Sequence, residues 1–268
     1  MALPIRDELT TRHFPWVTVA LIAINVVVFL FIQPSAAQYA PRTERNTAHE
    51  LDRAYENARF TARWAVIPCE VASGKARADH PKQCEEGDGS FAPVATGKSP
   101  FLGLLTSLFL HGSVEHIAGN MLFLWVFGNN VEDRLGKLGY LLFYLVGGVV
   151  ASLGFIVFNA HSAEPLIGAS GAIAAAMGAY LVFHPRGRVL TVVLAGTYQV
   201  VYLPAAVVLV LFFVTQFFTA DQHVAWQAHA VGMGFGFLVA LGLARLPRVR
   251  ARAQAQEVQA GLRPWEAF

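Results

Sequence analysis

The sequence is poor in charged residues. Only 14% of its residues are Asp, Glu, Lys or Arg, whereas 55% are hydrophobic. Soluble domains carry about 25% charged residues, so this composition favours a chain that lies mostly in lipid. The formal net charge is only +2. The chain therefore lacks the basic excess typical of nucleic-acid binding, and we expect no nucleic-acid partner.

Cysteine is also scarce, with only Cys69 and Cys84 in the chain. No C-x-x-C and no His/Cys cluster with zinc spacing occurs, so we expect neither a metal nor a cofactor. Both cysteines lie in one polar segment. A disulfide between them is the favoured interpretation if that segment faces an oxidising compartment, and two free thiols are the alternative.

Apolar stretches account for most of the remaining chain. A helix needs about 20 apolar residues to cross the hydrocarbon layer of a membrane. The fourth of the stretches is short and rich in Gly and Ala, which is typical of a closely packed central helix. Six stretches are candidate spans: Phe14–Ile32, Gly112–Val131, Leu138–Phe158, Gly168–Phe183, Tyr202–Phe218 and Val224–Leu246.

Basic residues are confined to alternate loops between these stretches, which predicts the orientation. Loops 159–167 and 219–223 contain no Lys or Arg. Cytoplasmic loops are enriched in Lys and Arg, so the basic loops and both termini are predicted to be cytoplasmic. The basic residues in question are Arg6, Arg12, Arg134, Lys137, Arg186, Arg188, Arg245, Arg248, Arg250 and Arg252.

The expected fold is an all-α membrane protein, a bundle of six transmembrane helices. Residues 1–13 form a cytoplasmic N-terminus, 14–246 the membrane domain with a long outer loop at 33–99, and 247–268 a cytoplasmic tail. A signal peptide cleaved near 34–37 is an alternative for the first span. We favour a retained helix because the apolar stretch is longer than the usual signal core. Residues 189–201 are interpreted as a membrane-surface segment before the fifth span.

The segment Gly168-Ala169-Ser170-Gly171 is the strongest candidate for chemistry. Serine in a membrane helix usually bonds to a backbone carbonyl. Here, however, small residues flank it at the start of a short helix, so other backbones can approach closely. The unpaired amides of a helix start could stabilise an oxyanion beside the serine oxygen.

Two further patterns place polar side chains inside predicted spans. His229, Gly232 and Gly236 share one helix face, and the glycines form a seam for close helix contact. An ionisable residue inside a membrane is a functional candidate, and a histidine that bonds to a carbonyl or lies in the headgroup zone is the equal alternative. His116 and Asn120 share a face at i and i+4. The predicted topology puts these groups and Ser170 at one depth near the outer surface, which predicts a water-accessible pocket.

At these residues the sequence resembles the rhomboid family of intramembrane serine proteases. The resemblance covers roughly 100–245. It rests on Gly168-Ala169-Ser170-Gly171, Ala228-His229-x-x-Gly232-x-x-x-Gly236, His116-x-x-x-Asn120, His111-Gly112-Ser113 and Gly128-Asn129-Asn130-Val131-Glu132-Asp133. The start Pro4-Ile5-Arg6-Asp7 looks like bacterial members.

The resemblance implies a Ser–His dyad in a bacterial inner membrane. Ser170 would attack the scissile carbonyl, and His229 would take its proton. Asn120, His116 and the Ser170 amide would hold the oxyanion. The implied substrate is a single transmembrane helix, cleaved near its outer end. Some members carry a tyrosine four residues after the serine, where this chain has Ala174, so another group must orient His229.

Two other functions stay open at this point. One is a catalytically silent binder of transmembrane helices, and the other is a transporter or proton channel that uses His116 and His229 as relays. Transporters often show internal repeats and paired broken helices, neither of which the sequence displays. The fifth span, which carries Pro204 and few packing glycines, is predicted to act as a gate. The sequence does not specify an oligomeric state.

Overall fold

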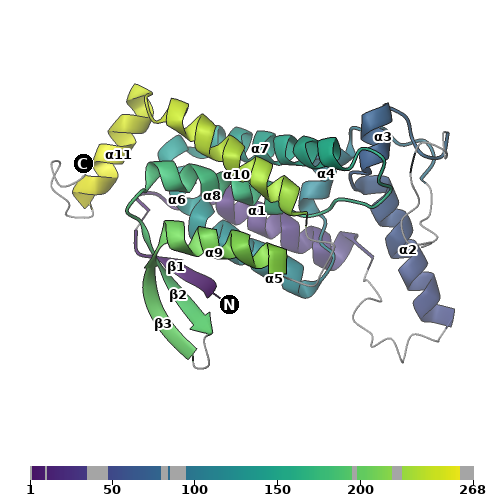
Figure 1. Ribbon diagram of the computed structural model, residues 1–268, viewed down its shortest axis with the longest axis horizontal. Coiled ribbons are helices and arrows are strands. Elements are labelled where there is room, and N and C mark those ends of the chain that lie inside the picture. The colour runs from purple at the N-terminus through teal and green to yellow at the C-terminus, as the bar shows by residue number, and fades with distance from the viewer. Residues whose placement is uncertain are drawn as a thin grey trace.

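The computed structural model describes residues 2–9, 11–34, 48–79, 84, 95–194, 198–218 and 225–259. Each of the six apolar stretches contains a helical segment, and these segments lie side by side in one bundle (Figure 1). They are α1 (Trp16–Val27) with η1 (Val28–Ile32), α5 (Val114–Phe123) with η5 (Leu124–Gly128) and α6 (Asn129–Leu135), α7 (Lys137–Phe158), α8 (Ser170–Phe183), α9 (Ala205–Phe218) and α10 (Trp226–Leu243).

Helix length and composition agree with a membrane setting. Within the described residues, Lys137–Phe158 and Trp226–Leu243 are long and apolar enough to cross a membrane. Trp16–Ile32, Ser170–Phe183 and Ala205–Gln216 are shorter apolar helices. At a rise of about 1.5 Å per residue, α7 is about as long as the hydrocarbon layer is thick.

The remaining helices lie at the two ends of the bundle. At one end are α2 (Ala48–Trp64), α3 (Pro68–Ser73), α4 (Gly103–Thr106) and the 3-10 turn η4 (Ser107–Phe109). At the opposite end is α11 (Pro247–Gln259), as Figure 1 shows. The predicted loop 219–223, residues 35–37 of the alternative cleavage site and the tail beyond 259 lie outside the described residues.

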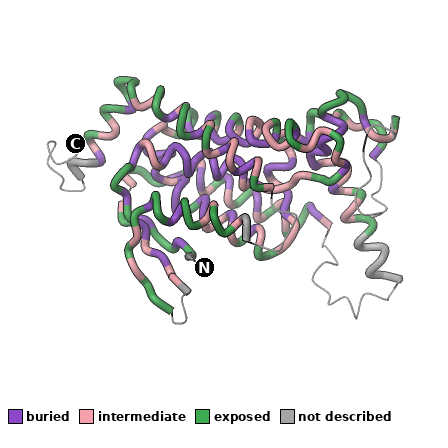
Figure 2. The backbone as a smooth tube through the Cα atoms, viewed as in Figure 1, coloured by how far each residue is buried: buried purple, intermediate pink, exposed green. Residues whose placement is uncertain are grey.

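Helix α8 occupies the interior of the bundle. Apart from Ser170, Leu181 and Val182, every residue of α8 is buried. Figure 2 shows that buried backbone lies in the middle of the bundle and exposed backbone along its outer edges. A helix surrounded on all sides by protein needs small side chains wherever a neighbouring helix comes close, which explains the Gly and Ala content of α8.

The expectation of an all-α fold is wrong at one place. Of residues 189–201, interpreted as a membrane-surface segment, the described ones belong to two antiparallel strands, β2 (Arg188–Leu194) and β3 (Tyr198–Pro204). The N-terminal strand β1 (Ala2–Asp7) completes an antiparallel sheet in the order β1-β2-β3. The segment is rich in valine, which suits strands. Its pairing partner β1 is remote in sequence, so no local pattern reveals it.

Acidic side chains of α6 hold separate parts of the chain together. The Glu132 carboxylate accepts hydrogen bonds from the amides of Val17 and Thr18 at 2.9 and 2.8 Å, which satisfies free donors at the start of α1. Asp133 accepts a hydrogen bond from the Arg12 amide at 3.1 Å. Arg134 donates to the carbonyl of Phe183, at the end of α8, at 2.9 Å.

Asp7 ties the sheet to the bundle. Its Oδ2 accepts hydrogen bonds from the Tyr180 hydroxyl at 2.6 Å and from the side-chain Nδ2 of Asn130 at 2.7 Å. Its Oδ1 accepts a hydrogen bond from the backbone amide of Leu9 at 3.0 Å. Burial raises the pKa of Asp7 from 3.8 to about 6, although the hydrogen bonds from Leu9 and Tyr180 act in the opposite direction. The N-terminal strand is thereby fixed to α8 through a buried carboxyl group.

This raised pKa predicts a pH-dependent stability. The folded state holds the Asp7 proton more tightly than the unfolded chain. The stability contributed by the protonated group is therefore complete below pH 3.8 and lost as the pH rises to about 6. A shift of this size corresponds to roughly 3 kcal/mol. Unfolding measured between these pH values should show a steeper loss of stability in the wild type than in Asp7→Asn. The exposed control Asp79→Asn should follow the wild type, and an Asp7→Asn profile equal to wild type would contradict the prediction.

Candidate active site

Helices α8 and α10 touch through their backbones. A Cβ added at Gly232 would overlap the carbonyl of Gly171, and one added at Gly236 would overlap the carbonyl of Ala175. Both pairs have the same sequence offset, so the helices run parallel and in register. Only glycine allows this approach, because any side chain at these two positions would enter the neighbouring helix.

This register places Ser170 and His229 at the same end of two adjoining helices. Ser170 is the first residue of α8, and His229 lies in the first turn of α10, one turn before Gly232. By the register of the glycine contacts, His229 lies within about 3 Å of helical rise of the level of Ser170, on its N-terminal side. Ser170 is half-buried, and His229 is buried. The structure therefore brings the predicted nucleophile and base to the same corner of the bundle.

The ring of His229 is held from α9. Its Nδ1 lies 2.7 Å from Oε1 of Gln216, and its ring centroid lies 6.1 Å from that of Phe212. An amide oxygen only accepts hydrogen bonds, so Nδ1 is the donor and the neutral ring keeps its lone pair on Nε2. Nε2 is buried and makes no hydrogen bond. This tautomer is the one that a proton acceptor for a serine hydroxyl requires.

Gly168 brings the loop that leads into Ser170 against α5. Its φ of +118° is a conformation that side chains rarely adopt. A Cβ there would lie 2.9 Å from Nε2 of His116 and 3.6 Å from Nδ2 of Asn120. The amide of Gly168 donates to the carbonyl of Ser107 at 2.9 Å, which fixes the loop. Both predicted oxyanion donors therefore border the backbone that leads into Ser170.

The polar atoms of His116 and Asn120 are oriented by their neighbours. The Gly112 amide donates to Nδ1 of His116 at 3.4 Å, so the proton of the neutral ring lies on Nε2. Nδ2 of Asn120 lies 3.0 Å from Nε2 of His111, so one amide hydrogen can be donated there while the second points elsewhere. His111 is fully buried, and its backbone amide and carbonyl both bond to Gln33.

Two contributors are not recognisable from sequence. The contact of His111 with Asn120 depends on a turn between η4 and α5 that no sequence motif indicates. Gln216 supplies the group that the absence of a tyrosine at Ala174 requires. It lies on a different helix from His229, so helical spacing gives no signal for their contact.

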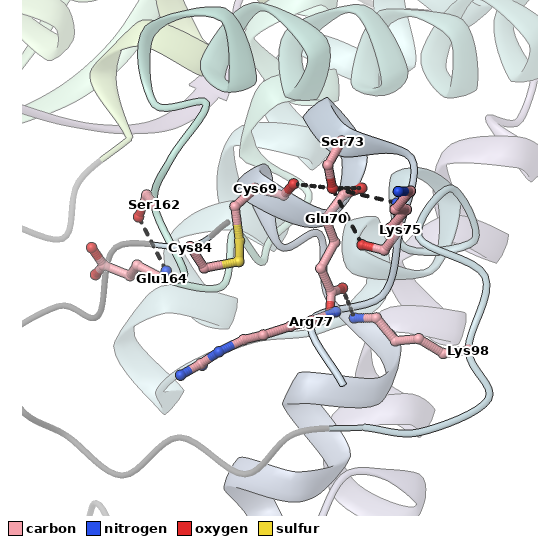
Figure 3. The surroundings of a disulfide bond; sticks show 9 residues. All are labelled: Cys69, Glu70, Ser73, Lys75, Arg77, Cys84, Lys98, Ser162 and Glu164. Carbon is pink, nitrogen blue, oxygen red and sulfur yellow. Dashed lines mark hydrogen bonds and ion pairs between the residues drawn. A yellow bond between two sulfur atoms is a disulfide. The ribbon is translucent and has the colours of Figure 1, made fainter. Parts of the chain in front are cut away.

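A disulfide-linked cluster supports the loop that leads to Ser170 (Figure 3). Cys69 and Cys84 are joined by a disulfide. The Cys69 amide donates to the Ser162 carbonyl at 3.1 Å, and the amide of Leu166 donates to the carbonyl of Val66 at 2.8 Å. These bonds pair the segment around α3 with the α7–α8 loop, which ends at the candidate nucleophile.

A buried ion pair completes this cluster. The carboxylate of Glu70 lies 2.6 Å from Nζ of Lys98, and both side chains are almost fully buried. Glu70 Oε1 also accepts a hydrogen bond from the Arg77 amide at 2.9 Å (Figure 3). A buried charge pair of this kind is costly to disrupt from one side, so it favours one arrangement of the loop.

Comparison with known proteins agrees with this geometry. The family model described as the Rhomboid domain matches residues 98–246. The chain belongs to the rhomboid family. It is 32% identical over 148 residues to the rhomboid protease GluP of Bacillus subtilis (strain 168), covering 55% of this chain and 27% of that protein. It is 27% identical over 168 residues to RHOMBOID-like protein 1 of Arabidopsis thaliana, covering 63% and 39%.

A third relative is the mitochondrial presenilin-associated rhomboid-like protein A of Danio rerio, 32% identical over 100 residues, with 37% of this chain and 26% of that protein covered. The chain thus spans only about a quarter to two fifths of the length of these relatives. The matched region contains α5 to α10 and therefore Ser170, His229, His116 and Asn120.

The glycine contact predicts a sharp positional effect in α10. Gly236→Val should lower the free energy of unfolding by about 1–3 kcal/mol, because its side chain would have to displace the α8 backbone at Ala175. Thermal unfolding in detergent would measure the change. Gly234→Val is the matched control, since a Cβ at Gly234 meets nothing within 4 Å. Equal destabilisation by both variants would show that the close contact is unimportant.

Proposed function

We propose that this chain is an intramembrane serine endopeptidase. The observation that carries the proposal is a buried His229 whose Nδ1 is held by Gln216 and whose Nε2 has no hydrogen bond, in the first turn of a helix that packs against the helix starting at Ser170. Membership of a family with a named protease supports it. The backbone contacts at Gly232 and Gly236 put Ser170 and His229 at the same end of two adjoining helices, which supports the proposal.

The reaction is a two-step acyl transfer. Ser170 Oγ attacks the scissile carbonyl as His229 Nε2 takes the hydroxyl proton, and the same proton then goes to the leaving amine. Asn120 Nδ2, His116 Nε2–H and the Ser170 amide stabilise the negative oxygen of the tetrahedral intermediate. Water then repeats the sequence on the acyl-enzyme, with His229 as the base, and releases the second product.

The proposed substrate is a single-span transmembrane segment cut near its outer end. A peptide bond within a helix is hydrogen-bonded and shielded by the adjacent turns of that helix. The substrate helix must therefore unwind locally before Ser170 can reach the bond. Helix α9 is the proposed gate. It exposes Val207, Val210 and Val214, and Phe212 packs against Phe123 of α5 with ring centroids 4.8 Å apart. Movement of α9 would also carry Gln216 away from His229. Opening of the gate would therefore remove the hydrogen bond that fixes the tautomer of His229.

We propose six spans with both termini in the cytoplasm of a bacterial cell, with the divisions 1–13, 14–246 and 247–268. Arg134 lies in the last turn of α6, Arg245 follows α10 and Arg248 lies at the start of α11, and Arg252 donates to the Arg134 carbonyl at 3.3 Å. Clustered basic groups at this end favour its cytoplasmic location. The disulfide at the opposite end fits an oxidising compartment.

The dyad is tested first with a serine-directed fluorophosphonate on the purified protein. Ser170→Ala should abolish labelling and also abolish cleavage of a reconstituted single-span substrate, because no other oxygen takes the place of Oγ. Ser152→Ala, a buried serine on α7, is the control and should retain both. A protein that binds the substrate without cleaving it or reacting with the probe would instead be a silent binder of transmembrane helices.

Gln216 is proposed as a positioning residue that acts through His229. Gln216→Leu should lower kcat by roughly tenfold to a hundredfold with little change in KM, because the ring loses the acceptor that fixes its tautomer. Gln216→Glu keeps an acceptor oxygen and should recover part of the rate. The ¹⁵N chemical shifts of the His229 ring report the tautomer directly. If the His229 tautomer were unchanged in Gln216→Leu, the proposed positioning role of Gln216 would be contradicted, even if the activity fell.

A further inference from the structure

The sheet β1-β2-β3 has two apolar faces, and only one of them packs on the bundle. Side chains alternate between the faces of a strand. On the inner face, Pro4, Val189 and Thr191 are buried. On the outer face, Val200 and Val192 are paired across β3 and β2, and Leu3 continues the row on β1. A sheet with one side in water normally carries polar residues there.

The outer face is also exposed. Val200 and Tyr198 are 59% and 84% exposed, and Leu3 is exposed as well. Tyr202, paired with Leu190, extends the same face towards the bundle. The outer face of the sheet, defined by Leu3, Leu190, Val192, Tyr198, Val200 and Tyr202, is therefore a contiguous apolar surface that no other described element covers.

The connection to α9 indicates whether lipid or water contacts the outer face of the sheet. Strand β3 ends at Pro204 and α9 begins at Ala205, with no intervening loop. Helix α9 exposes several apolar side chains, including Val207 and Val210. Figure 1 shows the strands projecting sideways from the bundle, beyond α9, rather than continuing past its end. The sheet therefore extends into the space that surrounds the bundle.

The polarity of the outer face changes along the strands. Arg188 lies at the end of β2 nearest the bundle, with its guanidinium 6.0 Å from the ring centroid of Tyr202. Arg6 is paired with Leu190 at the same end and is exposed. The other end carries Val200 and Tyr198. Arginine at the level of lipid phosphates, with tyrosine and aliphatic groups beside it, is the pattern of a membrane-interface anchor.

We propose that the outer face of the sheet is seated in the interfacial layer of the bilayer, with Arg6 and Arg188 among anionic headgroups. The hairpin then anchors the base of α9 to the membrane surface. The occupant of this face is lipid and not a second copy of the chain. The proposal concerns how the protein sits in its membrane, and it holds whether or not Ser170 reacts.

The test uses nitroxide spin labels on the whole protein in vesicles of phosphatidylcholine and phosphatidylglycerol. The disulfide uses both cysteines of the chain, so an introduced cysteine is the only labelling site. Val200→Cys and Leu3→Cys place the label on the outer face from two different strands. Gln199→Cys is the matched control, because Gln199 is exposed on the same strand but alternates to the opposite face.

Collisions with apolar oxygen and with a polar nickel chelate then distinguish lipid from water. We expect the oxygen-to-nickel collision ratio at positions 200 and 3 to exceed that at 199 several-fold, and to fall to the control value in Val200→Cys combined with Arg6→Gln and Arg188→Gln. Equal, water-like access at all three positions would overturn the proposal. Spin–spin broadening between labels at 200 would also overturn it, by showing a second copy on this face.

Discussion

The backbone contact between α8 and α10 is the constraint on which the candidate site depends. Gly232 and Gly236 let one helix lie directly against Gly171 and Ala175 of the other, and this contact sets both the distance and the register. Ser170 and His229 become neighbours as a consequence of that register. A larger residue in the seam would separate the helices by the width of a side chain, which exceeds the reach of a hydrogen bond.

Around this fixed pair, the structure uses separate elements for separate tasks. Helix α5 presents His116 and Asn120 to the Gly168 backbone, and His111 and Gln33 hold Asn120 in place. Helix α9 supplies Gln216, the acceptor for Nδ1 of His229. The proposed base is thus held by the same helix that is proposed to move for substrate entry. If the sheet that precedes α9 is anchored at the membrane surface, the start of α9 would stay in place while the rest of the helix moves.

The two ends of the bundle are stabilised differently. At the end near α3, a disulfide and the buried pair Glu70–Lys98 stabilise the segment around α3, which pairs at Val66 with Leu166 of the loop before Ser170. At the opposite end, Glu132 and Asp133 of α6 bind the entrance to α1, and Asp7 joins β1 to Tyr180 of α8. The segment Asn129-Asn130-Val131-Glu132-Asp133, which resembles the family pattern, therefore stabilises the end of the bundle opposite Ser170.

The sequence by itself determined the membrane class, the approximate helix positions and the residues worth placing together, because long apolar runs and glycine-flanked polar residues are strong local signals. It could not predict the sheet, since β1 and β2 are paired across most of the chain and apolar strands resemble surface segments. Nor could it predict Gln216 or His111 as partners of His229 and Asn120, because those contacts join residues with no helical spacing between them. Only the tertiary structure decided these contacts, since packing brings together side chains that no sequence periodicity relates.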